Sequence, residues 1–211
     1  MEKKLDSLYD NKLRIEDIRV LKHAETDIVT TKIKMVFRDK PFMPTVLYFT
    51  DLHKFLFEDI YYFAGKIRKT KMYKEEALLN RLSVDYSSPE EIISNLEDVF
   101  DRLKSTNILE MNDQELTVFV SDVLVDLWKT HPFREGNTRT CLVFLRLLLH
   151  SYGIHFNEDF FKNKNTYDYM RSALVAASFE AEDMNIKRNY SYVHRIIGDI
   201  ISDERKRFAG R

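Results

Sequence analysis

The chain has 211 residues, of which 44% are hydrophobic, and its 33 basic and 34 acidic residues leave a net charge of −1. This is material for one core, and we expect a single domain over residues 1–211 with no electrostatic attraction to nucleic acid or membranes. No stretch approaches the roughly 20 apolar residues of a membrane span, and the N-terminal residues lack the apolar core of a secretory signal. The single cysteine, Cys141, can form no internal disulfide, so we expect a cytoplasmic protein.

Apolar residues follow helical spacing along the first part of the chain. The stretches 13–21 and 28–36 predict two early helical segments, which the prolines at 41 and 44 interrupt. A third helix is expected from Thr50, as the N-cap, to Gly65, as the C-terminal stop.

Further helix signals follow downstream. Ser88 before Pro89 is typical of a helix start, and Asn112 with Glu115 resembles a capping box that opens an apolar helix. Two more helices are expected near 166–180 and 190–207. The pattern predicts an all-α, compact helical bundle.

Helical spacing fails between Gly65 and Ser87, where basic, hydroxyl and apolar residues alternate. We interpret residues 66–87 as a hairpin or extended flap. The alternative is a solvated connector whose lysines only keep it soluble.

Residues 131–140, HPFREGNTRT, place a histidine, a carboxylate and a glycine-centred turn before an apolar helix. The glycine allows a tight turn, after which three successive N–H groups would point at the start of the helix, a favourable place for an anion. His131 can exchange a proton near neutral pH, and Glu135 is a hard oxygen ligand for Mg²⁺. The candidate phosphate-binding residues are Gly136, Asn137, Thr138 and Arg139.

This stretch resembles the signature of the Fic family, which runs His, any, Phe, any, Asp or Glu, Gly, Asn, Gly or Lys, Arg, two of any residue, Arg. The matching positions are His131, Phe133, Glu135, Gly136, Asn137 and Arg139. The run FEDIYYFAGKIR also looks like the family's helix and following strand, and the resemblance extends from about residue 10 to 180. It implies a Fic-type helical bundle with a small β-hairpin flap that overlies the active site and binds a target protein by main-chain pairing.

The resemblance further implies transfer of AMP from ATP to a hydroxyl side chain of a target protein, with release of pyrophosphate. His131 would be the general base and Glu135 would hold Mg²⁺. Residues 136–139 would bind the phosphates. Phe133 would anchor the loop in the core, and Trp128 is expected in the core rather than under the adenine. A small antitoxin partner or self-modification stays open.

Two positions depart from the signature. Thr138 replaces glycine or lysine, and a β-branched residue disfavours a positive φ. Leu142 replaces the arginine that in the family grips the terminal phosphate and pairs with an inhibitory glutamate. No Ser/Thr-x-x-x-Glu-Gly/Asn inhibitory pattern is found, and Arg146 or Arg171 are candidates for the missing cation.

Other functions are weighed beside this one. The motif is compatible with transfer of another nucleotide or of phosphocholine, or with a nucleotide-binding regulator of weak turnover. A metal hydrolase is disfavoured because His150 and His155 lie far along the chain from His131. Helix-turn-helix binding to nucleic acid is disfavoured by the net charge.

Overall fold

The computed structural model describes residues 10–39, 42–155 and 164–209. Within these ranges the chain forms seven α-helices and no β-strand, which confirms the all-α prediction. They are α1 (Ile18–Asp39), α2 (Val46–Phe57), α3 (Ile92–Ser105), α4 (Asp113–Thr130), α5 (Asn137–Ser151), α7 (Lys164–Ser178) and α8 (Ser191–Ala209). The expectations for the first nine residues and for Pro41 lie outside the described ranges.

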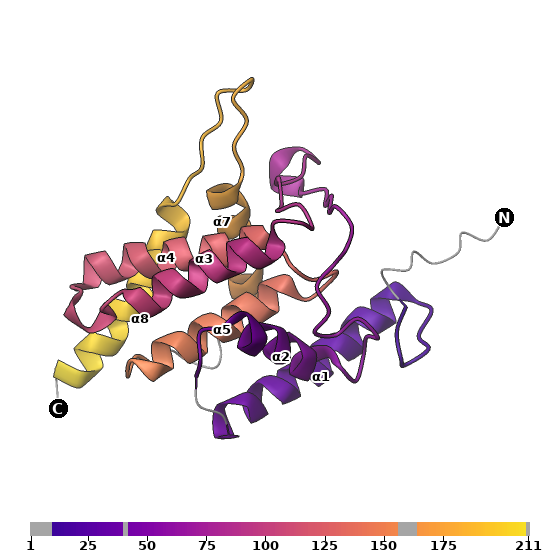
Figure 1. Cartoon of the computed structure of the whole chain (residues 1–211), viewed down its shortest axis with the longest axis horizontal. Helices are drawn as coiled ribbons and strands as arrows, with labels where there is room; N and C mark the ends of the chain where they lie inside the picture. The colour runs from indigo at the N-terminus through magenta and orange to yellow at the C-terminus, as the bar shows by residue number, and fades with distance from the viewer. Residues whose placement is uncertain (1–9, 40–41, 156–163, 210–211) are drawn as a thin grey trace.

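Helix α4 lies at the centre of the bundle, where it contacts α3, α5, α7 and α8 (Figure 1). Helix α2 packs against α1, α3 and α5. The candidate motif begins where α4 ends and continues into α5, so it is surrounded by the body of the molecule. None of the helices in the described part of the chain is long and apolar enough to cross a bilayer.

The starts of α4 and α2 can be compared with the N-cap residues that the sequence predicted. The Asn112 capping box is confirmed, because its Oδ1 accepts from the N–H groups of residues 114 and 115 and Glu115 Oε2 accepts from the Asn112 N–H at 2.9 Å. Thr50 as an N-cap is wrong. Helix α2 begins five residues earlier behind Thr45, whose Oγ1 accepts from the Tyr48 N–H at 3.1 Å. Thr50 instead lies inside the helix and donates to the Leu47 carbonyl at 2.9 Å.

Three helix boundaries also differ from expectation. Helix α1 is continuous from Ile18 onward, so the two early segments are one helix that starts after Leu13. Helix α2 ends at Phe57, and Gly65 lies in a later turn with φ +75°. Helix α3 begins one turn after Ser88, because the Ser88 hydroxyl donates to Glu91 Oε2 at 2.8 Å and holds the intervening residues in a turn.

The segment 66–87, which we call the flap, is not a β-hairpin. It turns back on itself at a tip closed by several backbone bonds, among them one from the Arg81 N–H to the Glu76 carbonyl at 3.0 Å and one from the Glu76 N–H to the Leu82 carbonyl at 2.9 Å. Between them lie the short 3₁₀ helix η2 (Ala77–Leu79) and two successive left-handed residues, Asn80 and Arg81. This tight tip and the side-chain bonds to other elements replace the strand ladder that we expected.

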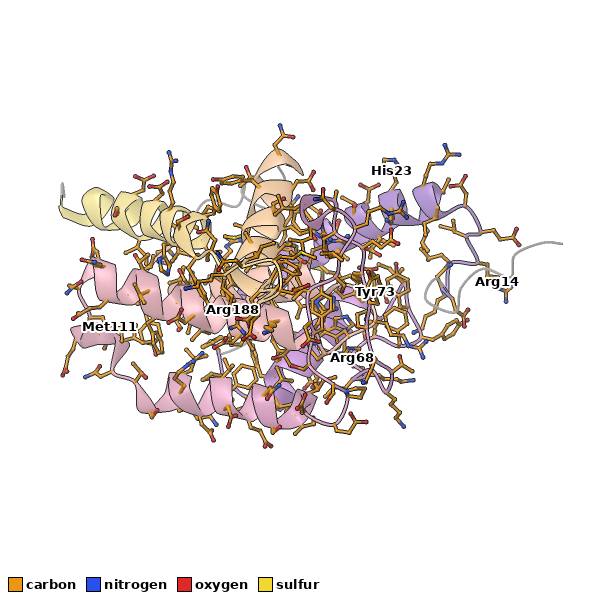
Figure 2. All side chains as sticks on the ribbon, turned by 90° about the horizontal axis from the view of Figure 1, so that it is seen from above. Arg14, His23, Arg68, Tyr73, Met111 and Arg188 are labelled. Carbon is orange, nitrogen blue, oxygen red and sulfur yellow. The ribbon has the colours of Figure 1, made fainter. Side chains whose placement is uncertain are left out.

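The flap still reaches the part of the molecule where the motif lies. In Figure 2 Met111, in the connection between α3 and α4, lies at the opposite end from Arg14, which precedes α1. Arg68 and Tyr73 of the flap lie between these two ends. The solvated-connector alternative therefore does not describe this segment, whose Arg68 is buried.

Candidate active site

His131 is the residue at which α4 ends. Its backbone is left-handed, with φ +47°, and its side chain is only 2% exposed. The Nδ1 lies 3.3 Å from the Trp128 carbonyl, which can only accept, so Nδ1 carries the proton and Nε2 carries the lone pair. Nε2 has no hydrogen-bond partner within the described structure. Burial lowers the pKa of His131 well below its usual value, with Lys74 adding to the effect, so the ring is a neutral base.

The turn at Gly136 requires glycine for two reasons. Its φ is +84°, which disfavours any side chain, and a Cβ would lie 2.5 Å from Phe57 Cζ. Helix α5 begins at the next residue, and its first bond within the helix runs from the Thr140 N–H to the Gly136 carbonyl at 3.0 Å. The N–H groups of residues 137–139 are therefore the open donors of a helix N-terminus.

Two motif side chains, those of Asn137 and Thr138, form hydrogen bonds that hold the motif loop and the start of α5 in place. Asn137 Oδ1 accepts from the Phe133 N–H at 2.9 Å, and its Nδ2 donates to the Phe133 carbonyl at 2.7 Å. This pairing uses Oδ1 and one of the two Nδ2 hydrogens to hold the loop, and the backbone N–H of Asn137 remains available. Thr138 is helical rather than of positive φ, and its Oγ1 accepts from Trp128 Nε1 at 2.9 Å.

The loop is also held from α2. The ring of His53 stacks on Phe133 with centroids 3.7 Å apart. The Gly65 N–H donates to His53 Nδ1 at 2.8 Å, so Nε2 carries the proton and donates to the Glu135 carbonyl at 2.9 Å. Trp128 and Phe133 are both fully buried, as expected of core residues.

Glu135 places its carboxylate beside the flap. Its Oε1 lies 3.5 Å from Lys74 Nζ. Burial works to raise the pKa of Glu135, but Lys74, the Gly136 N–H and Arg139 outweigh it, and the net shift is downward. The carboxylate is therefore ionised near neutral pH.

Arg139 points toward α1, where it forms an ion pair with the 3% exposed Glu25. Tyr61 donates a short hydrogen bond to the other oxygen of the same carboxylate. The Nη1 of Arg139 is buried and has no hydrogen-bond partner in the described residues. One edge of this guanidinium is thus fixed by α1, and the other is left for a ligand.

These groups line one cavity of about 390 Å³. Its lining comprises Lys22, Lys74, Glu75, Glu76, Tyr86, Trp128, His131, Glu135, Gly136, Asn137, Thr138, Arg139, Tyr167 and Arg171. All the candidate catalytic, metal-binding and phosphate-binding residues of the motif are brought together here. Of the two candidates for the missing cation, Arg171 lines the cavity and Arg146 does not. Leu142 is 1% exposed and belongs to the core.

Glu135 is the cavity's candidate ligand for a divalent cation. Within the described ranges no group of three or more His, Cys, Asp or Glu side chains is arranged to hold a metal. A single carboxylate fits Mg²⁺ that is bound mostly by phosphates and water, which is how this ion usually meets nucleotides. It does not fit a metal held by the protein alone.

Sequence reasoning missed several residues that line this cavity or hold its lining in place. Glu25, Glu76 and Tyr86 come from segments far from the motif, and nothing in their local pattern marks them. Lys74 belongs to the basic run of the flap, whose alternation was a signal for the segment but not for this residue. His53 lies in the helix before the run that resembles the family.

The fold and the cavity define a class of helical proteins in which the start of a helix, beside a buried histidine, opens onto a polar cavity. Residues 45–149 match the sequence model of the Fic/DOC family. The chain belongs to this family.

Individual relatives are similar in sequence or in fold. A protein of Sinorhizobium fredii named probable protein adenylyltransferase y4lH is 31% identical over 121 residues, which span 56% of this chain and 59% of that relative. The BepC protein of Bartonella tribocorum, solved with bound AMPPNP, has a TM-score of 0.73 at 21% identity and covers 90% of both chains. A Fic domain of Bartonella quintana, solved with bound ADP, has a TM-score of 0.74 at 21% identity over 90% of this chain and 89% of its own.

Proposed function

We propose that the protein transfers AMP from ATP to a hydroxyl side chain of a target protein. The observation that carries the proposal is His131 Nε2, a buried lone pair without a partner that opens onto a cavity headed by the N-terminus of α5. The name of the Sinorhizobium fredii relative supports the reaction. The AMPPNP and ADP bound to the two Bartonella proteins support the class of donor.

His131 would act as the general base. The neutral ring accepts the proton of the target hydroxyl at Nε2 while that oxygen forms a bond to the α-phosphorus of ATP. The bond from the α-phosphorus to the bridging oxygen breaks, and pyrophosphate leaves. The Trp128 carbonyl at Nδ1 keeps the ring in the tautomer that this step needs and stabilises the imidazolium that forms.

The phosphates would be bound by donors of two kinds. The open N–H groups of residues 137–139 and the free Nη1 of Arg139 are positioned before any ligand arrives. Such donors stabilise charge that grows on phosphate oxygens in the transition state. Mg²⁺ held by Glu135 would neutralise further charge on the phosphates, with Lys74 exchanging its present carboxylate partner for a phosphate oxygen.

The flap would bind the target protein. One of its ends is tied to the motif, since the Arg68 N–H donates to the Pro132 carbonyl at 2.8 Å. Its other end is tied to α4, since the Ser87 N–H donates to the Lys129 carbonyl at 3.4 Å. The flap's own backbone bonds lie between residues 76 and 82, so backbone groups outside this tip stay open for a target segment. Self-modification is a special case of the same arrangement.

Labelled nucleotides test the proposal. The protein is incubated with Mg²⁺ and ATP, GTP, UTP or CTP labelled at the α-phosphate, with and without a cell extract as the source of targets. We expect protein-bound label from ATP, and a loss on the order of 10²–10⁴-fold in the His131→Ala variant. The change leaves the turn at Gly136 intact, so ATP should still bind to the variant.

The same experiment separates the other candidates. Label from GTP, UTP or CTP but not from ATP would show a different nucleotidyl donor. Binding of ATP without any label would show a nucleotide-binding regulator. Equal labelling by a folded His131→Ala protein would remove the proposed base from the reaction.

A further inference from the structure

Besides Lys22, Lys74, Glu75 and Tyr167, three polar side chains outside the motif line the cavity. Glu76 and Tyr86 come from the flap, and Arg171 comes from α7. They are far apart in the sequence, yet the fold brings them to one wall of the cavity that holds His131. The proposed transfer does not require them, so their chemistry needs a separate account.

Arg171 is held by Glu76 in a defined orientation. Its Nη2 lies 2.7 Å from both oxygens of the Glu76 carboxylate. The Glu76 side chain is 2% exposed, whereas that of Arg171 is 39% exposed. The buried carboxylate therefore lies behind the arginine and orients it. Because this pairing uses one nitrogen of the guanidinium, the other two nitrogens stay available to a ligand.

Tyr86 adds an unused donor beside this pair. Its hydroxyl is buried and has no hydrogen-bond partner among the described residues, although the side chain lines the cavity. Burial raises the pKa of Tyr86, and the nearby Glu76 raises it further, so the hydroxyl stays protonated. An unpaired buried donor is costly, and such a group at a cavity wall points to a ligand acceptor.

A phosphate is the acceptor that fits a guanidinium and a hydroxyl together. The family's second motif arginine is absent here, where Leu142 lies in the core, and Arg146 does not line the cavity. We propose that Arg171, positioned by Glu76, and the hydroxyl of Tyr86 form a second anion subsite that binds the terminal phosphate of the donor. This rests on the proposed function in one respect, namely that the donor is a nucleoside triphosphate.

Calorimetry with Mg²⁺ tests the subsite without relying on turnover. The full chain carrying His131→Ala is titrated with ATP, ADP and inorganic tripolyphosphate, which has no base. We expect ATP to bind at least about tenfold more tightly than ADP, since a charge-assisted contact to the third phosphate is gained.

Variants in this background assign the preference to residues. Arg171→Gln should weaken ATP and tripolyphosphate about tenfold or more and ADP less than about threefold. Tyr86→Phe keeps the ring that packs on Trp128 and should weaken ATP alone by about threefold. Glu76→Gln should also reduce the preference for ATP, because the guanidinium loses its orienting partner. Arg188→Gln is the matched control, since Arg188 is likewise paired to a glutamate but does not line the cavity.

Each contrary result overturns the proposal. Absence of an ATP preference in the parent chain removes the subsite. Equal weakening of ATP and ADP by Arg171→Gln, with tripolyphosphate unchanged, shows that the arginine contacts the base. Tighter ATP binding by Glu76→Gln shows that the carboxylate competes with phosphate instead of positioning the arginine.

If the melting temperature shows that Arg171→Gln is unfolded, Arg171→Lys replaces it and should lose part of the ATP preference. A protein that transfers no AMP but prefers ATP retains the subsite and loses only the proposed function.

Discussion

The motif loop, residues 131–139, and the flap, residues 66–87, form two sides of one cavity but are stabilised in different ways. The loop is fixed by bonds to near neighbours, such as those between Asn137 and Phe133, and by the stacked ring of His53. The flap has backbone bonds of its own only at the tip, between residues 76 and 82, and otherwise depends on backbone bonds at its two ends and on side chains that reach other elements. A preformed loop suits phosphate binding, whereas a loosely paired flap leaves backbone groups for a protein partner.

Two of the contacts between these regions are made by charged side chains of the flap. Near the cavity mouth Lys74 of the flap lies 3.5 Å from Glu135 of the loop. At the base, Arg68 donates from Nε to the His131 carbonyl at 2.8 Å and from Nη1 to the Thr70 carbonyl at 2.7 Å, and it also reaches the Ser87 carbonyl. Changes at these contacts test how far the chemistry of the loop depends on the flap.

The largest effect is expected at Glu135. Replacing it by Gln removes the charge that holds Mg²⁺, so transfer should fall about 10²-fold or more. EDTA should abolish transfer by the unchanged protein, and Mg²⁺ or Mn²⁺ should restore it. The measurement is the rate of label incorporation from ATP at several Mg²⁺ concentrations.

Lys74→Gln is the control for this prediction, because it removes the partner of Glu135 and keeps the carboxylate. Its requirement for Mg²⁺ should persist. Full activity of the Glu135→Gln protein, or of the unchanged protein in EDTA, would show that the carboxylate acts only at the helix start, where the dipole favours a negative charge.

The next effect is on stability, at the base of the flap. Arg68→Met keeps most of the apolar stem but leaves several buried carbonyls without their donor, including that of His131. The free energy of unfolding should fall on the order of 4 kcal/mol. Urea denaturation followed by circular dichroism measures the change. A loss below about 1 kcal/mol would mean that the loop and the flap are not coupled through this arginine.

The stability of the protein should depend on pH through His53, which packs on the motif loop. Burial lowers the pKa of His53 to about 4. Between pH 6.5 and 4 His53 is protonated in the unfolded chain but stays neutral in the folded protein. The free energy of unfolding therefore falls as the pH drops from 6.5 to 4, by up to about 3 kcal/mol. Denaturation curves at several pH values measure it. His53→Gln should be less stable at pH 7 but lose less on acidification, and an unchanged slope would contradict the assignment.

The sequence predicted the motif loop well because the loop is local. Its turn requires Gly136, its anchor is Phe133, and its helix begins directly after the turn, all within a few residues. The capping box at Asn112 was predicted for the same reason. Both features are decided by backbone groups that lie next to the side chains that satisfy them.

The residues that pair with the flap and with Arg139 could not be predicted from the sequence, because they lie far away along the chain. Arg171 and Glu76 are separated by 95 positions, and Glu25 precedes Arg139 by more than a hundred residues. Thr50 was mistaken for an N-cap because its residue type is right, while Thr45 had the free N–H groups of the first turn beside it. A hairpin was expected for the flap because alternation resembles a strand, but Glu76 turns toward α7 and a 3₁₀ helix closes the tip.

The smallest effect is expected at that tip. Arg81 pairs with Glu75 at 2.8 Å, but the two side chains are 79% and 52% exposed. Water screens such a pair and its side chains lose entropy on pairing, so Arg81→Ala should change the free energy of unfolding by less than about 1 kcal/mol. Urea denaturation at low and high salt measures it. A larger, salt-sensitive loss would show that the tip is held as firmly as the base at Arg68, and the contrast between a fixed loop and a loosely paired flap would then be wrong.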